Sequence, residues 1–360
     1  MESIRLRGCL ERFKDAIQKG ELRVGFAGGS ITTAADSANW PTFVRGWMVH
    51  EYPNVRLWFN NAAIGATGSL CGLAMAQREF IDTDCDLVFV EYAVNDHSLS
   101  RDERMRTREG LIRKLLENHV DVVLVYTYFS EMYERENTDV LPQSIADFEL
   151  IAEHYCISSV YMAYPVLRAF EDGVIPWNMW LPDGTHPQSL GGYLYAQEVI
   201  RCISAEMQRS DGEKCPKGEH LPEPINAKHW QYAREIKLRE VRTYGPWTME
   251  RERAFSWFEE KLYTCAPESH IAFDFCGRGI SIIFNYGKTT GLIEYRIDGG
   301  EWKTYAFERY WWVPEENFVN AVMFADDLEC TTHMFELRIA HVSQKDFTSC
   351  NCSILKILTV

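Results

Sequence analysis

LRVGFAGGS (22–30) joins a short apolar run to a glycine pair and a serine. The run is continuous and apolar, which is typical of a β-strand buried on both faces of a sheet. Four more such runs, rich in Val, Tyr and Phe, occur in the first 210 residues: VRLWFNNAAIG (55–65), DLVFVEYAV (86–94), VDVVLVYTY (120–128) and ISSVYMAY (157–164). Apolar residues have helical spacing in the stretches 38–50, 67–81, 104–118, 143–155 and 188–208. This alternation predicts a three-layer α/β domain with a mostly parallel sheet and right-handed crossovers.

The pattern changes after about residue 211, and 360 residues are too many for one comfortable core. SDGEKCPKGEHLPEPIN (210–226) is polar and contains three prolines and two glycines, which is typical of a linker. Beyond it, short runs with period-two character are bounded by turn residues, and IDGGEW (297–302) indicates a tight hairpin. We therefore expect a catalytic-type domain over 1–212, a linker over 213–225, and an all-β sandwich or jelly roll over 226–360.

Charge and composition exclude several classes of function. The chain has 52 acidic and 37 basic residues, a formal net charge of −15, which disfavours nucleic acids and anionic membrane surfaces as partners. We see no signal peptide and no apolar stretch long enough to span a membrane. The eleven cysteines are scattered without a CxxC pair, so we expect reduced thiols, a cytoplasmic location, and neither a metal site nor a cofactor.

Polar and small residues follow successive predicted strands, and ligands bind at the carboxyl ends of such strands. Ser30 follows the first strand, where Gly28 and Gly29 allow a sharp turn. A nucleophile, a phosphate-binding loop and a plain turn all fit this local pattern. Small residues at 62–68 allow a backbone N–H to approach a substrate, or a loop to pack tightly. Asn95 follows the third strand, where it is either a donor to a developing oxyanion or a turn residue.

Pro182-Asp183-Gly184-Thr185-His186-Pro187 is a non-helical loop between the last predicted strand and the final helix. A serine hydroxyl becomes a good nucleophile when an imidazole accepts its proton, and the imidazole is oriented by a carboxylate. Asp183, three residues before His186, can reach its Nδ1 and leave Nε2 for Ser30. A capping aspartate and a solvent-facing histidine are the alternative for this loop taken alone.

Together, the four elements resemble the sequence blocks of the SGNH hydrolases, also called the GDSL family. The blocks are matched by residues 28–31, 61–66, 94–96 and 183–186, and the resemblance covers roughly residues 20–205. Two positions depart from the family pattern, because Gly29 replaces its usual aspartate and Ala66 replaces its usual second-block glycine. The resemblance implies a flavodoxin-like SGNH domain that transfers an acyl group through Ser30, with His186 as base and Asp183 as its partner.

The same resemblance implies an oxyanion hole made by the N–H of Ser30, an N–H at Gly65 or Ala66, and the side chain of Asn95. No metal is required for this chemistry. An SGNH unit followed by a β-sandwich is also similar to the two-domain carbohydrate acetylesterases of carbohydrate esterase family seventeen. That likeness implies an acetylated oligosaccharide of mannan or xylan type as substrate, and a second domain that resembles a carbohydrate-binding module.

Aromatic residues close to the predicted site are candidate sugar contacts, or core and acyl-pocket residues. They are Trp40, Tyr92, Trp177 and Trp180, and in the second domain Trp302, Trp311 and Trp312. A general short-chain or lipolytic esterase is the alternative function, and a non-catalytic glycan-binding protein is a further one. The sequence gives neither the sugar nor the oligomeric state, although an oligomer is compatible with it.

Overall fold

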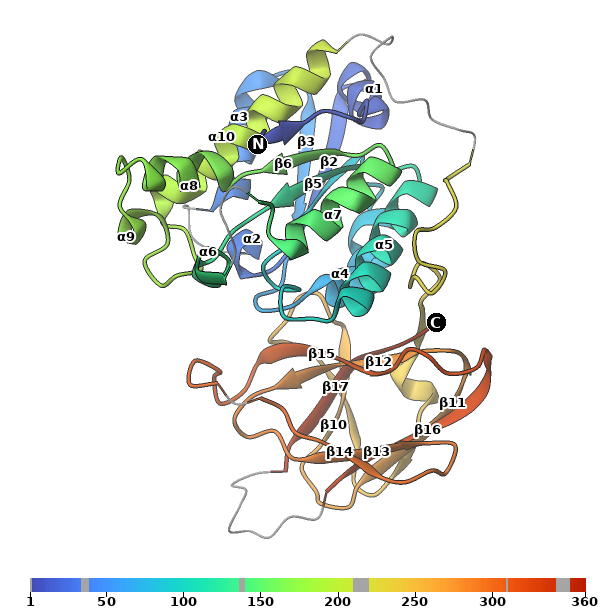
Figure 1. The fold of residues 1–360 in the computed structure, drawn as a ribbon. Helices are drawn as coiled ribbons and strands as arrows, with labels where there is room; N and C mark the ends of the chain where they lie inside the picture. Colours follow the sequence, from blue (N-terminus) through green and yellow to red (C-terminus); the bar gives the residue numbers. More distant parts are fainter. Residues whose placement is uncertain (1, 34–38, 136–139, 210–219, 309, 341–349) are drawn as a thin grey trace. The chain divides into compact units, whose positions relative to one another are not determined.

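The computed structural model describes residues 2–33, 39–135, 140–209, 220–308, 310–340 and 350–360 (Figure 1). The chain divides into two compact units, residues 1–231 and 232–360. The sequence placed the start of the second domain at 226 rather than 232. Part of the expected linker, 213–219, lies outside the described residues.

Residues 225–231 belong to the first unit because they are hydrogen-bonded to helix α5 (Arg101–Glu117). The backbone N–H groups of Ile225 and Asn226 donate to the Glu109 carboxylate at 2.6 and 2.8 Å. The side chain of Gln231 accepts from Arg113 at 2.6 Å. These contacts extend the first unit beyond the proline-rich segment that the sequence analysis assigned to the linker.

A six-stranded sheet forms the centre of the first unit, in the order β1-β6-β5-β4-β2-β3. Its strands are β1 (Ile4–Arg5), β2 (Glu21–Ala27), β3 (Arg56–Asn61), β4 (Leu87–Val90), β5 (Asp121–Tyr126) and β6 (Ser158–Tyr161). All neighbours are parallel except β1, which pairs antiparallel to β6. Strands β4 and β5 are buried along their whole length, as continuous apolar runs require.

Helices lie on both faces of this sheet, so the unit has three layers (Figure 1). They are α1 (Glu11–Lys19), α2 (Ser30–Thr33), α3 (Trp40–Glu51), α4 (Ser69–Ala76, continued by a π-helical turn Gln77–Ile81), α5, α6 (Ser130–Arg135), α7 (Gln143–His154), α8 (Tyr164–Glu171), α9 (Trp177–Trp180) and α10 (Ser189–Gln208). Helices α4 and α7 pack against α5, and α3 packs against α10. The predicted parallel α/β fold is confirmed, while β1 and the short helices α2, α6, α8 and α9 were not predicted.

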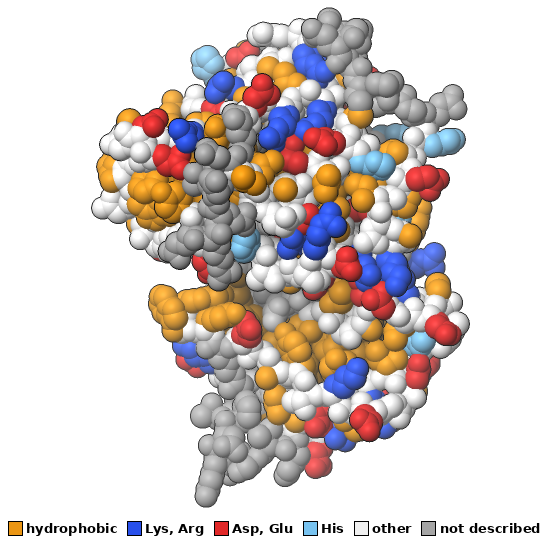
Figure 2. Space-filling model, viewed as in Figure 1, with side chains coloured by type: hydrophobic (Ala, Val, Ile, Leu, Met, Phe, Trp, Pro, Cys, Tyr) orange, Lys and Arg blue, Asp and Glu red, His pale blue; other side chains and the backbone are white. Residues whose placement is uncertain are grey.

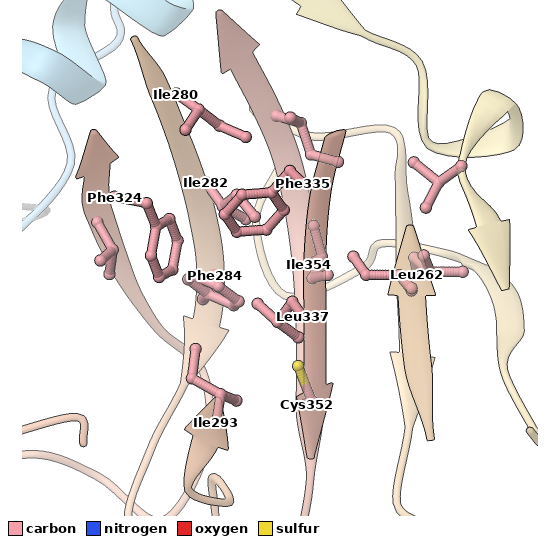
Figure 3. Close-up of a cluster of buried hydrophobic side chains, with 14 of the residues drawn as sticks. Leu262, Ile280, Ile282, Phe284, Ile293, Phe324, Phe335, Leu337, Cys352 and Ile354 are labelled. Carbon is pink, nitrogen blue, oxygen red and sulfur yellow. The ribbon is translucent and has the colours of Figure 1, made fainter. Parts of the chain in front are cut away.

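Two antiparallel sheets form the second unit, in the orders β15-β12-β17-β10-β9, with β7 also pairing with β17, and β14-β13-β16-β11-β8. The strands are β7 (Arg234–Ile236), β8 (Arg242–Tyr244), β9 (Thr248–Arg251), β10 (Glu260–Thr264), β11 (His270–Gly277), β12 (Ile280–Tyr286), β13 (Ile293–Ile297), β14 (Lys303–Tyr305), β15 (Phe318–Ala325), β16 (Thr331–Ile339) and β17 (Cys352–Thr359). Alternate residues of both sheets form one apolar core, which includes Ile282, Phe284 and Phe335 (Figure 3). The predicted all-β domain is confirmed.

The predicted hairpin IDGGEW connects β13 to β14. Asp298 and Gly299 have φ angles of 53° and 67°, the two positive values that a tight type I′ hairpin turn needs. Strand β17 and the strands before β11 were not predicted.

Acidic and basic side chains are interspersed on the face shown in Figure 2, with hydrophobic side chains between them. On this face the net negative charge is therefore not collected into one patch. Within the described part of the chain, no helix combines the length and the apolarity needed to cross a membrane.

The cysteines differ from expectation at one position. Nine of the described cysteines carry free thiols, but Cys156 is disulfide-bonded. The expectation of reduced thiols throughout is therefore wrong at Cys156.

Candidate active site

Ser30 is the first residue of α2, immediately after the Gly28-Gly29 turn that ends β2. It therefore lies at the carboxyl edge of the parallel sheet. The Gly29 carbonyl accepts hydrogen bonds from the backbone N–H groups of Thr32 and Thr33, at 3.1 and 2.9 Å. Because the C=O and N–H of one trans peptide point in opposite directions, the Ser30 N–H points away from α2.

Gly29 has no space for a side chain. A Cβ atom built on it would lie 1.9 Å from Oδ1 of Asn95, so the Asn95 side chain covers the α-carbon of Gly29. This contact places Asn95, from the end of β4, beside the residue that precedes Ser30.

The side chains of Ser30, His186 and Asp183 form a continuous hydrogen-bonded chain. His186 Nε2 lies 2.7 Å from Ser30 Oγ, and His186 Nδ1 lies 2.7 Å from Asp183 Oδ2. When Nδ1 carries the proton and donates it to Asp183, Nε2 is the acceptor for the serine hydroxyl. This arrangement can activate a serine oxygen as a nucleophile at neutral pH.

The loop that carries Asp183 and His186 is held mainly by its own backbone. Asp183 Oδ1 accepts from the N–H groups of Thr185 and His186 at 2.9 and 2.7 Å. Gly184 has a φ of 85°, and its carbonyl accepts from the N–H of Ser130 at 2.7 Å. The side chains of His186 and Asp183 remain 47% and 55% exposed, so a large substrate can reach them.

Hydrogen bonds control the charge of Asp183. Partial burial acts to raise its pKa, but the backbone N–H of His186, the His186 ring and the Thr185 N–H together lower the pKa below its ordinary value. Asp183 is therefore a carboxylate that is ready to stabilise a positively charged imidazole.

The loop after β3 approaches the serine at Gly65. A Cβ atom built on Gly65 would lie 3.8 Å from Ser30 Cβ, so its α-carbon faces the serine. The next residue, Ala66, has a left-handed φ of 55°. The structure thus brings Ser30, Gly65, Asn95 and His186 together from four separate connections of the sheet.

Three of the aromatic residues predicted to contact sugar are core residues instead. Trp40, Tyr92 and Trp180 are fully buried, so they present no ring face to a ligand. Trp40 packs on Phe26 and Phe89 and donates its indole N–H to Thr32 Oγ1 at 3.2 Å. The spacing of these residues in the sequence did not show whether their side chains line a cleft or lie in the core beneath it.

Tyr92 and Trp180 have different buried partners. Tyr92 lies against Gly72 of α4, where an added Cβ would be 2.4 Å from its hydroxyl. Trp180 stacks on Tyr128 and donates to the Tyr195 hydroxyl at 3.1 Å.

Trp177, the fourth candidate, is half-buried. It packs on Tyr133, Phe170 and Trp180, with ring centroids 5.0–5.7 Å apart. Trp177 lies a few residues before the loop that carries Asp183 and His186.

The candidate aromatic residues of the second unit lie at its surface. Trp311 is 89% exposed, and its neighbour Trp312 stacks on Tyr310 with a centroid distance of 5.2 Å. Trp302 lies against the guanidinium groups of Arg296 and Arg338. Trp311 and Trp312 therefore have ring faces available to a ligand.

Sequence reasoning missed a buried ion pair beneath Asn95. Asp96 and Arg108 are both fully buried and joined at 2.8 Å. The other Asp96 oxygen accepts from the Ser69 N–H at 2.9 Å and thus ties the small-residue loop to the end of β4. The predicted Asn95-Asp96 turn gave a local signal for Asp96, but its partner Arg108 lies about two helical turns into α5.

A second missed residue is Glu91, a fully buried carboxyl at the end of β4. It accepts hydrogen bonds from the Gly29 N–H and from the hydroxyls of Thr32 and Thr127. The available signal was a single acidic residue within the otherwise apolar run LVFVEYAV (87–94).

Among the described residues, no group of three or more His, Cys, Asp or Glu side chains is arranged to hold a metal ion. The chemistry described above uses only side chains and backbone groups of the chain.

Comparison with known proteins gives a match in structure but not in sequence. No protein-family model and no curated protein sequence matches the chain. A crystal structure of CEX, a two-domain esterase active on acetylated mannans, superposes with a TM-score of 0.84 at 22% identity, covering 99% of this chain and 97% of the other. CEX co-crystallised with mannopentaose gives the same TM-score at 21% identity, covering 99% of this chain and 96% of that one.

The acetylxylan esterase Axe2 from Geobacillus stearothermophilus is also similar, with a TM-score of 0.44 and 17% identity over 54% of this chain and 97% of that one. The match to CEX shows that the two-domain fold is shared along nearly the whole chain. The resemblance inferred from the sequence motifs is therefore confirmed at the level of the fold.

Proposed function

We propose that this protein is a serine esterase that removes O-acetyl groups from acetylated oligosaccharides derived from mannan or xylan. The observation that carries the proposal is the chain of two 2.7 Å contacts from Ser30 Oγ through His186 to Asp183. Its position at the carboxyl edge of a parallel sheet is where such folds bind their ligands.

In the first half-reaction, Ser30 Oγ attacks the acetyl carbonyl carbon while His186 Nε2 accepts the hydroxyl proton. The carbonyl oxygen becomes an oxyanion that accepts hydrogen bonds from the Ser30 N–H, the N–H of Gly65 or Ala66, and the Asn95 side chain. Asp183 stabilises the imidazolium. Collapse of the tetrahedral intermediate breaks the bond to the sugar oxygen, which takes the proton from His186 and leaves as an alcohol.

In the second half-reaction, water attacks the acetyl-Ser30 carbonyl, and His186 accepts its proton. The second tetrahedral intermediate expels Ser30 Oγ, which regains a proton from His186, and acetate is released. Each step needs one proton acceptor, and His186 serves both in turn.

Three observations support a glycan as the alcohol part of the ester. The half-exposed His186 and Asp183 leave room for a bulky substrate. The fold is shared with an esterase that is active on acetylated mannans. Trp311 and Trp312 of the second unit present aromatic surface, and flat rings suit the faces of sugars.

The direct test is acetate release from acetylated glucomannan and acetylated xylan oligosaccharides by the full-length protein and by Ser30→Ala. We expect release from one of these glycans, and a loss of at least about a thousandfold in Ser30→Ala with unchanged thermal stability. His186→Ala should lose activity to a similar extent, because the two residues act as one unit.

Other outcomes assign a different function. Hydrolysis of aryl butyrate or octanoate in preference to acetate, with no release from either glycan, would indicate a general short-chain esterase. Failure of a fluorophosphonate to label Ser30 in the wild-type protein, together with glycan binding, would indicate a non-catalytic binding protein. Trp311→Ala combined with Trp312→Ala should weaken glycan binding while leaving aryl acetate hydrolysis unchanged.

A further inference from the structure

Glu91 is a titratable group that the proposed reaction does not use, although it lies directly beneath the nucleophile. Its side chain is fully buried at the end of β4. Oε2 accepts from the Gly29 N–H at 3.4 Å and from the Thr32 hydroxyl at 3.1 Å, and Oε1 accepts from the Thr127 hydroxyl at 2.6 Å. Glu91 therefore joins the residues on both sides of Ser30 to the end of β5.

The direction of the Thr32 hydrogen bond is fixed by its surroundings. Thr32 Oγ1 accepts from the Trp40 indole N–H at 3.2 Å, so its own proton is available for Glu91. The Thr32 carbonyl accepts from the side-chain amides of Asn39 and Asn61 at 3.1 and 2.8 Å. Thr32 thus holds α2 against three neighbouring segments, and Glu91 supplies the acceptor at the base of this network.

Glu91 has no route to the reacting atoms. It is enclosed by protein, and its oxygens are occupied by groups of the nucleophile turn and β5. Burial raises its pKa, opposed by the hydrogen bonds from Thr127, Thr32 and Gly29, and the charge of Asp96 also acts to raise it. A general acid or base must reach the substrate directly or through one water, so Glu91 acts through position rather than proton transfer.

We propose that Glu91 is a positioning residue for the nucleophile, which holds the Gly28-Gly29-Ser30 turn so that Ser30 Oγ meets His186 and the Ser30 N–H faces the oxyanion. This inference rests on the proposed esterase function. The geometric demand is strict, because a displacement of about 1 Å at a reacting group can lower the rate about a hundredfold. Without an acceptor at position 91, the Gly29 N–H and the Thr32 hydroxyl proton would lose the acceptor that they have in Glu91, and the turn would have to move.

The test compares Glu91→Leu with Glu91→Gln in the full-length protein. Leu removes both acceptors, and we expect kcat on 4-nitrophenyl acetate to fall about 10- to 100-fold while KM changes less than about threefold. Gln keeps an oxygen for Gly29 and Thr32 and can donate its amide to the Thr127 hydroxyl, so it should restore kcat to within about threefold of wild type. The rate of fluorophosphonate labelling of Ser30 should follow kcat in both variants.

Glu206→Leu is the matched control. Glu206 is equally buried, but its carboxylate accepts hydrogen bonds from Ser158 and Arg209 instead of from the Ser30 turn. This variant should lose thermal stability as Glu91→Leu does and retain the wild-type kcat.

A Glu91→Leu protein with a lower melting temperature but an unchanged kcat would overturn the proposal. A Glu91→Gln variant whose kcat is no higher than that of Glu91→Leu would also overturn it. If Glu91→Leu does not fold, Thr32→Val decides, because it removes only the hydroxyl that links Glu91 to α2. We expect Thr32→Val to lower kcat about 3- to 10-fold with little change in KM, and an unchanged kcat would refute the positioning role. Wild-type protein that neither hydrolyses the ester nor labels would refute the esterase function instead.

Discussion

The two halves of the candidate active site are built in opposite ways. The nucleophile turn is held by hydrogen bonds to residues distant in the sequence, such as the buried Glu91 and the half-buried Asn61. The loop with Asp183 and His186 lies at the surface and is fixed mostly by hydrogen bonds within four residues. A residue can thus be positioned either by many long-range contacts or by one local turn, and this site uses both.

The two halves of the site also differ in the pKa of the carboxyl group that each contains. Burial, the largest effect, raises the pKa of Glu91, whereas hydrogen bonds lower the pKa of the half-exposed Asp183 despite its partial burial. The opposite pKa shifts of the two carboxyls distinguish the structural group, Glu91, from Asp183, which must remain charged.

The largest effect that tests this comparison is expected at Gly29. In Gly29→Ala the added methyl group would lie 1.9 Å from Asn95 Oδ1, so Asn95 or the turn must move. We expect kcat for aryl acetate to fall about a hundredfold or more, as expected for loss of an oxyanion donor. The measurement is kcat and KM on protein whose melting temperature is known.

Gly46→Ala is the control for that substitution. Gly46 lies in α3 with no atom within 4 Å of an added Cβ, so alanine should be neutral or slightly stabilising and leave kcat unchanged. A Gly29→Ala variant with wild-type kcat would contradict the placement of Asn95 over the turn.

A smaller effect is expected in the surface loop. Gly184→Ala forces a side chain onto a φ of 85° and places its methyl group 2.7 Å from Ser130 Oγ. We expect a stability loss of about 1 kcal/mol and a fall in kcat of about tenfold, since the loop must shift His186.

Gly173→Ala separates these two contributions. Gly173 has a similar φ of 73° but no neighbour within 4 Å, so it should show the loss of stability alone. Equal kcat values for the two variants would show that the loop tolerates displacement.

The smallest effect is a pH dependence of stability. The folded-state pKa of Glu91 is raised above its ordinary value of 4.5, so the folded protein holds this proton where the unfolded chain has released it. The stability contributed by that proton is present below about pH 4.5 and is lost as the pH rises through the folded-state pKa. Glu91→Gln cannot ionise, so its melting temperature relative to wild type should increase from pH 4.5 to pH 8.

Asp183→Asn is the comparison for this measurement. The pKa of Asp183 is lowered below 3.8, so its stabilising effect is present above that pH and is lost only in more acidic solution. The difference between its melting temperature and that of the wild type should therefore stay constant from pH 4.5 to pH 8. If the melting temperature of Glu91→Gln relative to wild type also stays constant over this range, Glu91 ionises as an ordinary carboxyl does.

The parts of the site that depend on local sequence were predictable. Asp183 and His186 share one short loop, and Ser30 and Asn95 each follow a strand whose apolar run was clear. Parallel strands end at one edge of the sheet, so these residues were expected to meet, and the structure joins Ser30 to His186 at 2.7 Å.

Which side chains near the site are buried in the core was not predictable. Trp40 and Trp180 flank the site in sequence, yet each is turned into the core by partners from other elements, Thr32 and Tyr195. Sequence spacing places a residue along an element but does not give the layer that its side chain occupies. The same limit explains Glu91, whose three hydrogen-bonding partners come from two other segments.

Strand β17 shows a related limit in the second unit. CSILKILT is a central strand paired with β7, β10 and β12, but its apolar run lacks the strict alternation that marked β11 and β16. A register shift between Ile283 and Phe284 of the pairing strand accompanies this break in period.

The separation of 156 positions between Ser30 and His186 also sets the order in which the two halves of the site are synthesised. At 5–20 residues per second, a ribosome adds this interval in roughly 8–30 s. The serine and its turn leave the ribosome first, and no partial chain ending before residue 186 has a base to activate them. Under the proposed function, the nascent protein therefore cannot hydrolyse esters until the first unit is almost fully synthesised.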